Sequence, residues 1–325
     1  MKCLLIFLFS ALFSIYCDAQ ITIELRKSFI DSFRNKITIE TDYQIFYAHK
    51  SPNPGSKDGD LHFAGYSSTI GLSMVAEIMN AKDQKKGVQL VHQKEGKGEP
   101  SEMIHLRGVW RIWCEHPGET QGFLQGANDI SIENTNPPHV FEIHPVLQLD
   151  DIDVSSSLKG ITGFSYKDAQ DAFNRYSNIR CLLIDHDPFV RIETNGIGYN
   201  YVDFWLQPNS LQFEQVDDGL FAFCTIYDSK FVPANGDEDN LILHKLRVAF
   251  VRDSPAYNKL ISLKKGQYLH VVGIPRIDLN LVRWRMDHAH DRPEVLQWNL
   301  PIEMVAVAIL SNSTTNTNSH AHSNN

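Results

Sequence analysis

A group of acidic and histidine side chains in the first half of the chain has the residue types that bind transition metals. On a β-strand, side chains two residues apart share a face, so Glu142 pairs with His144 and Asp60 pairs with His62. Carboxylate and imidazole groups are the ligands of zinc and iron sites. We therefore predict a site for a divalent transition metal. The predicted ligands are Asp60, His62, His116, His139, Glu142 and His144.

The same residues also have a purely structural interpretation. His144 precedes Pro145, where its ring would hydrogen-bond to backbone at a kink in the strand. Glu142 would then pair with Arg107 or Arg111. Both interpretations stay open, because the spacing permits a metal site without requiring one.

Tryptophan and arginine alternate in two short segments, 110–113 and 283–285. Aromatic rings beside cationic side chains are suited to stacking on a nucleobase or a sugar. The alternative is that each arginine stem covers a neighbouring ring within a strand. We predict a ligand-binding role for Trp110, Arg111, Trp113, Arg283 and Trp284.

Other catalytic chemistries find less support in the sequence. The chain has no G-x-S-x-G, H-E-x-x-H or P-loop motif. His288 and His290 form a second candidate metal pair, although the charges around them also fit a solvated turn. Cys114 is a poor partner for His116 as a nucleophile, and we expect it to be a half-buried thiol.

Composition and charge limit the class of protein and its partners. A chain of 325 residues with 42% hydrophobic and 21% charged residues has the balance of a globular protein, and its length fits two domains better than one. The net charge of -9 argues against a nucleic-acid partner, because binding to phosphates depends on lysine and arginine.

The N-terminus has the pattern of a secretory signal peptide. Lys2 precedes an apolar run over 3–16, and Ala19 ends a small-residue cleavage site. We predict a signal peptide over 1–19 and export to the periplasm or the extracellular space. A lipid anchor on Cys17 is the less favoured alternative, and no transmembrane segment is expected after cleavage. The mature chain would keep three cysteines, which allow at most one disulfide: Cys114, Cys181 and Cys224.

The elements that would position these residues are mostly strands. Runs of β-branched and aromatic residues, separated by Gly, Pro, Asn and Asp, predict antiparallel β structure. One clear helix is expected after a capping box at 165–168. Residues 88–91 read as a strand, and residues 21–39 read as a helix or as a helix that runs into a strand.

The two halves of the chain repeat a loose plan. Residues 106–111 have an echo at 271–276, and residues 141–145 have one at 298–301. About five strands per half suit a small Greek-key barrel of the OB type. We therefore predict a mainly β protein with two OB-like barrels or sandwiches. The predicted boundaries are 1–19 for the signal peptide, 20–154 for an N-terminal β domain, 155–310 for a C-terminal domain with the helix, and 311–325 for a disordered tail.

Three stretches resemble a group of exported bacterial proteins of no established activity. They read DGDLHFAG at 58–65, VAEIMNA at 75–81 and HVFEIHPV at 139–146. The resemblance covers roughly residues 50 to 150. It implies an OB-like barrel and export, and it carries over no catalytic residues.

These observations favour a ligand-binding β module of the periplasm or cell envelope. An oligosaccharide or another envelope component is the candidate ligand. The alternatives are a metal-dependent hydrolase that uses the His/Asp/Glu cluster, and a structural or protein-interaction module. Metal content separates the first two, because a catalytic centre should retain its ion.

Overall fold

The structure is a computed structural model. It describes residues 21–99, 102–116, 122–126, 132–195, 198–233, 240–288 and 296–311. The predicted signal peptide and nearly all of the predicted tail lie outside the described residues, so both stay predictions. Ser311 is the exception, because it is the last residue of strand β18 (Ile302–Ser311). Among the described residues, no helix has the length and apolar character needed to span a membrane.

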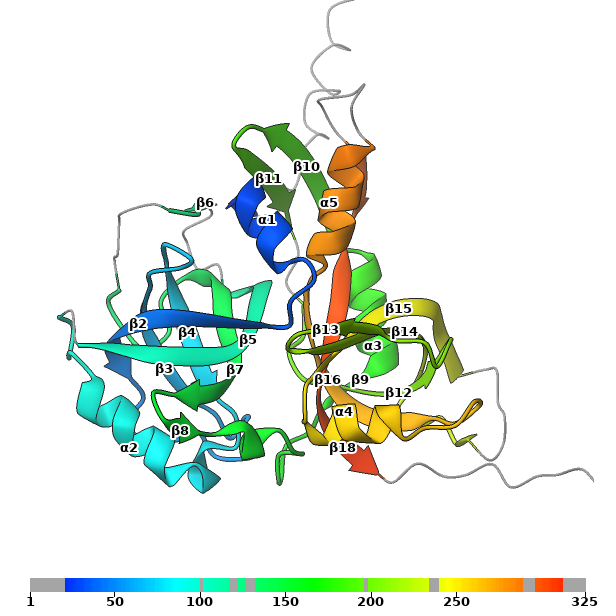
Figure 1. Ribbon diagram of the computed structural model, residues 1–325, viewed down its shortest axis with the longest axis horizontal. Coiled ribbons are helices and arrows are strands. Elements are labelled where there is room, and N and C mark those ends of the chain that lie inside the picture. The colour runs from blue at the N-terminus through cyan, green and yellow to red at the C-terminus, as the bar shows by residue number, and fades with distance from the viewer. Residues whose placement is uncertain are drawn as a thin grey trace, which may run out of the picture.

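Five strands of the first half close into a barrel (Figure 1). β2, β3 and β4 form an antiparallel meander, β5 pairs with β2 and β7, and a parallel pairing of β4 with β7 closes the ring. Along these strands, residues such as Leu61 and Phe63 join the main core while their neighbours face outward. The strands are β2 (Thr38–Ala48), β3 (Leu61–Ser67), β4 (Leu72–Ile78), β5 (Met103–His116) and β7 (His139–Leu149), with β8 (Ile152–Asp153) at the edge.

Five strands of the second half close in the same order. β12, β14 and β15 form the meander, β16 pairs with β12 and β18, and a parallel pairing of β15 with β18 completes the ring. Both are small Greek-key barrels, which confirms the predicted fold. The strands besides β18 are β12 (Val202–Pro208), β14 (Gly219–Tyr227), β15 (Leu241–Val251) and β16 (Leu269–Ile277), with β9 (Lys167–Asp168) and β13 (Glu214–Val216) at the edges.

A third sheet lies above the two barrels in Figure 1. It joins strands from both sides of the predicted domain boundary at 154, in the order β17, β10, β11, β1, β6. The boundary itself stays a prediction. The strands are β1 (Ile21–Arg26), β6 (Gly122–Leu124), β10 (Arg180–His186), β11 (Phe189–Thr194) and β17 (Leu296–Asn299).

The described residues form five α-helices, more than the sequence predicted. In the segment 21–39, expected as a helix or as a helix that runs into a strand, a helix does run into a strand, but a further strand precedes it. α2 occupies the segment expected as a strand at 88–91, since a short apolar run does not distinguish the two elements. The predicted helix exists as α3, and Asp168 caps it by accepting a hydrogen bond from the Asp171 backbone N–H. The helices are α1 (Lys27–Phe33), α2 (Lys85–Lys94), α3 (Ala169–Ser177), α4 (Pro255–Ile261) and α5 (Leu279–Asp287), with 3-10 turns η1 (Ala81–Asp83) and η2 (Ser155–Ser157).

Of the two predicted pairs of repeated segments, one is confirmed and the other is wrong. Residues 106–111 lie on β5 and residues 271–276 on β16, the same strand of each barrel. The counterpart of β7, however, is β18, whereas residues 298 and 299 end strand β17 of the third sheet. The likeness of residues 298–301 to residues 141–145 therefore reflects similar residue types and not an equivalent place in the fold.

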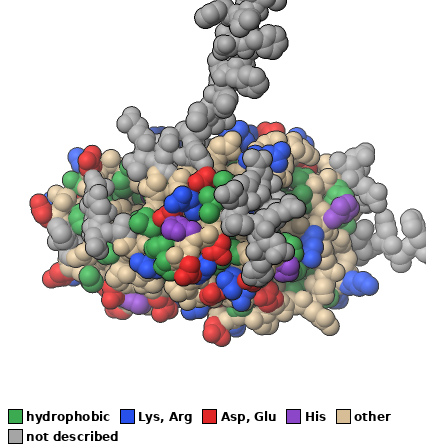
Figure 2. Space-filling model, turned by 90° about the horizontal axis from the view of Figure 1, so that it is seen from above, with side chains coloured by type: hydrophobic (Ala, Val, Ile, Leu, Met, Phe, Trp, Pro, Cys, Tyr) green, Lys and Arg blue, Asp and Glu red, His purple; other side chains and the backbone are tan. Residues whose placement is uncertain are grey.

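The surface shows charges of both signs. On the face seen in Figure 2, Asp and Glu side chains are scattered among Lys and Arg side chains. This mixed pattern differs from the basic stripe of a typical nucleic-acid surface.

Candidate metal centre

Polar side chains from three adjacent strands meet on the outer face of the first barrel. Asp60 immediately precedes β3, and His62 lies at the start of this strand, opposite Glu77 of β4. β4 runs beside β7, which carries Glu142 and His144. The strand alternation turns these residues away from the barrel core. Each is nevertheless buried, with an exposed fraction of 9% or less. Tyr201 of the second barrel contacts two of these residues, and Asp58, before β3, contacts the Asp60 backbone.

His144 lies at the centre of the group. Its Nε2 is 3.5 Å from Asp60 Oδ2, and its Nδ1 is 3.4 Å from Glu77 Oε2 and 3.7 Å from Glu142 Oε2. One donor atom from each of Asp60, Glu77 and His144 lies within 4.8 Å of the others. This spacing allows one ion to contact all three residues.

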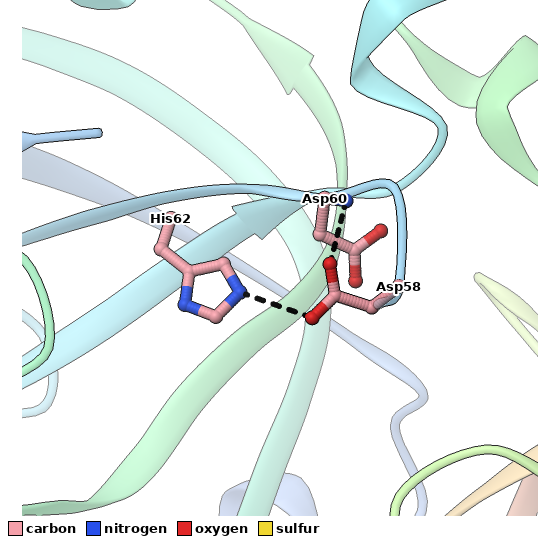
Figure 3. A group of neighbouring side chains, drawn as sticks. All are labelled: Asp58, Asp60 and His62. Atoms are coloured by element: carbon pink, nitrogen blue, oxygen red, sulfur yellow. Dashed lines mark hydrogen bonds and ion pairs between the residues drawn. The ribbon is translucent and has the colours of Figure 1, made fainter. Parts of the chain in front are cut away.

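A second, overlapping group reaches toward the surface. Figure 3 shows the Asp58 carboxylate between the imidazole of His62 and the backbone of Asp60. Asp58 Oδ1 accepts a hydrogen bond of 3.1 Å from the Asp60 N–H, and Asp58 Oδ2 is 3.9 Å from His62 Nε2. His62 Nε2 is also 3.6 Å from Glu77 Oε2, and its ring stacks on His49. His62 therefore connects the two groups.

The second barrel contributes a tyrosine to the site. The Tyr201 hydroxyl, just before β12, donates a hydrogen bond of 2.6 Å to Asp60 Oδ2 and lies 2.6 Å from His144 Nε2. A phenol in this position orients both a carboxylate and an imidazole. Groups that hydrogen-bond to metal ligands commonly orient them in this way. The centre thus lies where the two barrels meet.

Glu142 connects the group to a buried arginine. Arg111 of β5 donates to Glu142 Oε2, and its Nε donates to the Pro275 carbonyl of the second barrel at 2.9 Å. On the other side, Glu142 Oε1 lies 3.1 Å from His139 Nε2. The glutamate is held on both sides by these contacts.

Burial and mutual charge shift the pKa values of these groups. Burial raises the pKa of Glu77 to about 8 and also raises that of Asp60, because a buried carboxylate loses its hydration. Burial alone would lower the pKa of His144, but Glu77 and Asp60 hold it well above its ordinary value. Burial would raise the pKa of Glu142, but Arg111 holds it well below its usual range.

The buried atoms of this group are incompletely satisfied. Counting partners among the described residues, Asp60 Oδ1, His144 Nδ1 and both ring nitrogens of His62 make no hydrogen bond. Such atoms are costly to bury without a partner. Carboxylate and imidazole donors left in this state fit the ligand set of a divalent transition metal.

The structure brings most of the predicted ligands into one network and leaves one at its edge. Asp60, His62 and His144 lie together, Glu142 and His139 adjoin them, and the half-exposed His116 contacts the ring of His139. The structural interpretation of the sequence holds for Glu142, which pairs with Arg111. For His144 it does not, because the partner is the side chain of Tyr201 and not the backbone.

Three contributors were missed by the sequence interpretation: Glu77, Asp58 and Tyr201. For Glu77 a signal existed, since it is the single charged residue in the apolar strand Leu72–Ile78, and charged residues are rarely buried without a partner. Asp58 lies in a turn, and Tyr201 comes from the other barrel. Neither carries a local pattern.

The predicted stacking residues divide into two groups. Trp110, Arg111 and Trp113 are at most 1% exposed, so their rings and guanidinium cannot contact a ligand in this structure. Trp284 is exposed and lies with Arg283 on helix α5, not on a strand. The second candidate metal pair cannot be placed, because His290 lies outside the described residues.

The cysteines have a structural role in the core. Cys114, Cys181 and Cys224 are buried and free, and burial raises the pKa of the Cys114 and Cys181 thiols to about 12. A thiol that stays protonated is a poor nucleophile.

Comparisons with known proteins do not assign this chain to a family. No family model matches the chain, and no curated protein matches it. A murine DNA binding protein bound with ds DNA aligns at a TM-score of 0.19 and 8% identity, covering 86% of this chain and 100% of that one. A deletion mutant of the single-stranded DNA binding protein from Thermus aquaticus aligns at 0.18 and 11% identity, covering 75% and 87%. Scores this low carry no argument about fold or ligand.

Proposed function

We propose that this protein binds a divalent transition-metal ion, such as zinc, where its two barrels meet. Asp60, Glu77 and His144 are the proposed ligands, and His62 is close enough to join them. The ion would be a structural centre that fastens the first barrel to the second through Tyr201.

The charge balance of the buried group carries this proposal. Asp60, Glu77 and Glu142 bring three carboxylates, each at most 3% exposed, against the single guanidinium of Arg111. Three negative charges less one positive charge leave two to be compensated. Buried charges need a partner, and a divalent cation supplies the missing two. Without it, protons must do so, in keeping with the raised pKa values of Glu77 and His144.

The burial favours a structural centre over a hydrolytic one. A catalytic metal keeps an open position for water or substrate, whereas a structural metal is enclosed by protein ligands. Asp60 and His144 are at most 1% exposed, and Tyr201 covers both. The hydrolase alternative is therefore the less favoured of the two metal hypotheses.

Metal content and thermal stability of Asp60→Asn test the proposal. The substitution keeps the size of the side chain and removes the carboxylate. Protein without an affinity tag and without residues 312–325 should retain about one zinc ion per chain, and added Zn²⁺ should raise its melting temperature. We expect Asp60→Asn to lose both the ion and this shift.

Asp278→Asn is the matched control. Asp278 is a buried carboxylate of the second barrel, 2% exposed, and contacts none of the proposed ligands. This variant should bind zinc as the wild type does. Wild-type protein with far less than one equivalent of Zn²⁺ or Mn²⁺, and with no thermal shift on their addition, would refute the proposal.

A further inference from the structure

A groove in the second barrel gathers aromatic and apolar side chains that remain exposed. It lies between β14, β15 and α5, has a volume of about 410 Å³, and is called the α5 groove below. Its lining includes Phe223, Lys245, Arg247, Asn280, Leu281 and Trp284. The volume is within the range of small-molecule sites, about 300–1,000 Å³.

Exposed apolar side chains are concentrated in this groove. Phe223, Leu281 and Trp284 are 47%, 41% and 53% exposed, and they are three of nine large hydrophobic residues with this degree of exposure among the described residues. Apolar side chains gathered at one place on a surface commonly mark a binding site. The groove therefore differs from the rest of the surface.

Each of the two rings packs against one neighbouring side chain, which restrains it. One face of Trp284 packs on His288 with ring centroids 4.4 Å apart, and the indole is otherwise largely exposed. Lys245 Nζ lies 4.4 Å from the centre of the Phe223 ring. Rings ordered in advance lose little entropy when a flat ligand packs on them.

Polar groups beside the rings can bind hydroxyl groups. Asn280 and Lys245 line the groove with hydrogen-bonding side chains. Arg247 is 4% exposed at the base of the groove, and its Nε–H has no hydrogen-bond acceptor among the described residues. Because this nitrogen is also closed to solvent, hydrogen bonds to a ligand in the groove would come from Asn280 and Lys245.

The charge of the groove excludes a polyanion as the best ligand. Arg247 is already paired with Glu303 at 2.8 Å, and Glu214 and Asp278 lie within 3.8 Å of it. The whole chain has a net charge of -9. Binding to nucleic acid depends on uncompensated basic residues, so an uncharged ligand with flat faces and many hydroxyls fits better.

We propose that the α5 groove binds a neutral oligosaccharide, with sugar rings stacked on Trp284 and Phe223. Hydroxyl groups of the sugar would contact Asn280 and Lys245. The site is independent of the proposed metal centre, because none of the proposed metal ligands lines the groove.

Calorimetric titration with defined sugars tests this proposal. The probes are hexasaccharides of β-linked glucose, β-linked N-acetylglucosamine, β-linked xylose and α-linked glucose, with a single-stranded oligothymidylate as the polyanion. At least one hexasaccharide should bind with a Kd below about 1 mM. Trp284→Ala should weaken this binding at least about tenfold, the scale of one lost stacking contact.

Tyr199→Ala supplies the matched control, because Tyr199 is a 40% exposed aromatic residue that does not line the groove. It should bind the sugar as the wild type does. Trp284→Ala should melt at the wild-type temperature, since it removes a surface ring. The proposal is overturned if no hexasaccharide binds, if binding survives Trp284→Ala with Phe223→Ala, or if the oligothymidylate binds more tightly than every sugar.

Discussion

The two barrels place an arginine opposite a glutamate on matching strands, but the residues around the two pairs differ. Arg111 faces Glu142 across β5 and β7, and Arg276 faces Glu303 across β16 and β18. Each guanidinium also donates to a backbone carbonyl of the other barrel. The shared pairs thus join the barrels reciprocally.

At three positions beside these pairs, the first barrel has polar side chains and the second has apolar ones. The strand pairings of the two barrels show which strands are equivalent. β4 and β7 of the first barrel correspond to β15 and β18 of the second, and β3 corresponds to β14. Three positions can then be compared directly. The first barrel has His62, Glu77 and His144 where the second has Phe221, Ala249 and Val305.

The charge balance follows the same division. In the second barrel, two buried guanidinium groups, Arg247 and Arg276, match two buried carboxyl groups, Glu303 and Asp278, in number, although burial still raises the pKa of Asp278. In the first barrel, one arginine faces an excess of carboxylates. The comparison indicates that the common fold needs only the Arg–Glu pair. The additional acids and imidazoles of the first barrel have another role, which we propose is to bind a cation.

Removal of the paired glutamate should lower the stability of the second barrel more than that of the first. Glu303→Gln leaves Arg276 and Arg247 without their shared partner, and we expect a loss of about 3–5 kcal/mol in the free energy of unfolding, as for other broken buried pairs. Glu142→Gln should cost less, because Arg111 keeps Glu115 and the excess of acids is relieved. Urea unfolding of the metal-free proteins measures both. Equal losses would contradict the difference in charge balance.

Loss of the Tyr201 hydroxyl should weaken the connection between the barrels. Tyr201→Phe leaves Asp60 and His144 without a shared partner, which should cost about 1–3 kcal/mol. It should also lower zinc affinity about 10- to 100-fold, the usual effect of removing a group that orients metal ligands. Competition with a chelating dye measures this affinity.

Tyr43→Phe is the control for Tyr201→Phe. The Tyr43 hydroxyl is buried inside the first barrel and donates to the Met74 carbonyl at 2.9 Å. Its removal should lower stability and leave zinc affinity unchanged. A similar loss of affinity in both variants would show a general effect of destabilisation.

The pH dependence of the second barrel should reflect one buried acid. Burial, reinforced by Glu303, raises the pKa of Asp278 from 3.8 to about 7. Between these pH values the folded chain holds a proton that the unfolded chain has released, so stability from this group is present below the lower pKa and is lost as the pH rises. Asp278→Asn should therefore flatten the decline of stability from about pH 4 to about pH 7 in metal-free protein. Its carbonyl can still cap α5. Parallel curves for variant and wild type would contradict the raised pKa.

Much of the fold could be predicted because alternation and turn residues are local signals. The capping Asp168 and the repeat of residues 106–111 at 271–276 identified real elements. Helix α2 was missed because its apolar run is short, and its tertiary packing decides the element. The stacking role predicted for Trp110 failed in a similar way, since burial depends on a neighbouring barrel that the local sequence does not specify.

The sequence by itself determined that Asp60 shares a face with His62 and Glu142 with His144, because the two-residue period of a strand is a local property. Only the tertiary structure decided that these faces meet. The parallel pairing of β4 with β7 brings Glu77 beside His144, and the second barrel brings Tyr201 over both. Contacts across a sheet and between barrels depend on which distant strands pair, and that choice is made by the packing of the whole core.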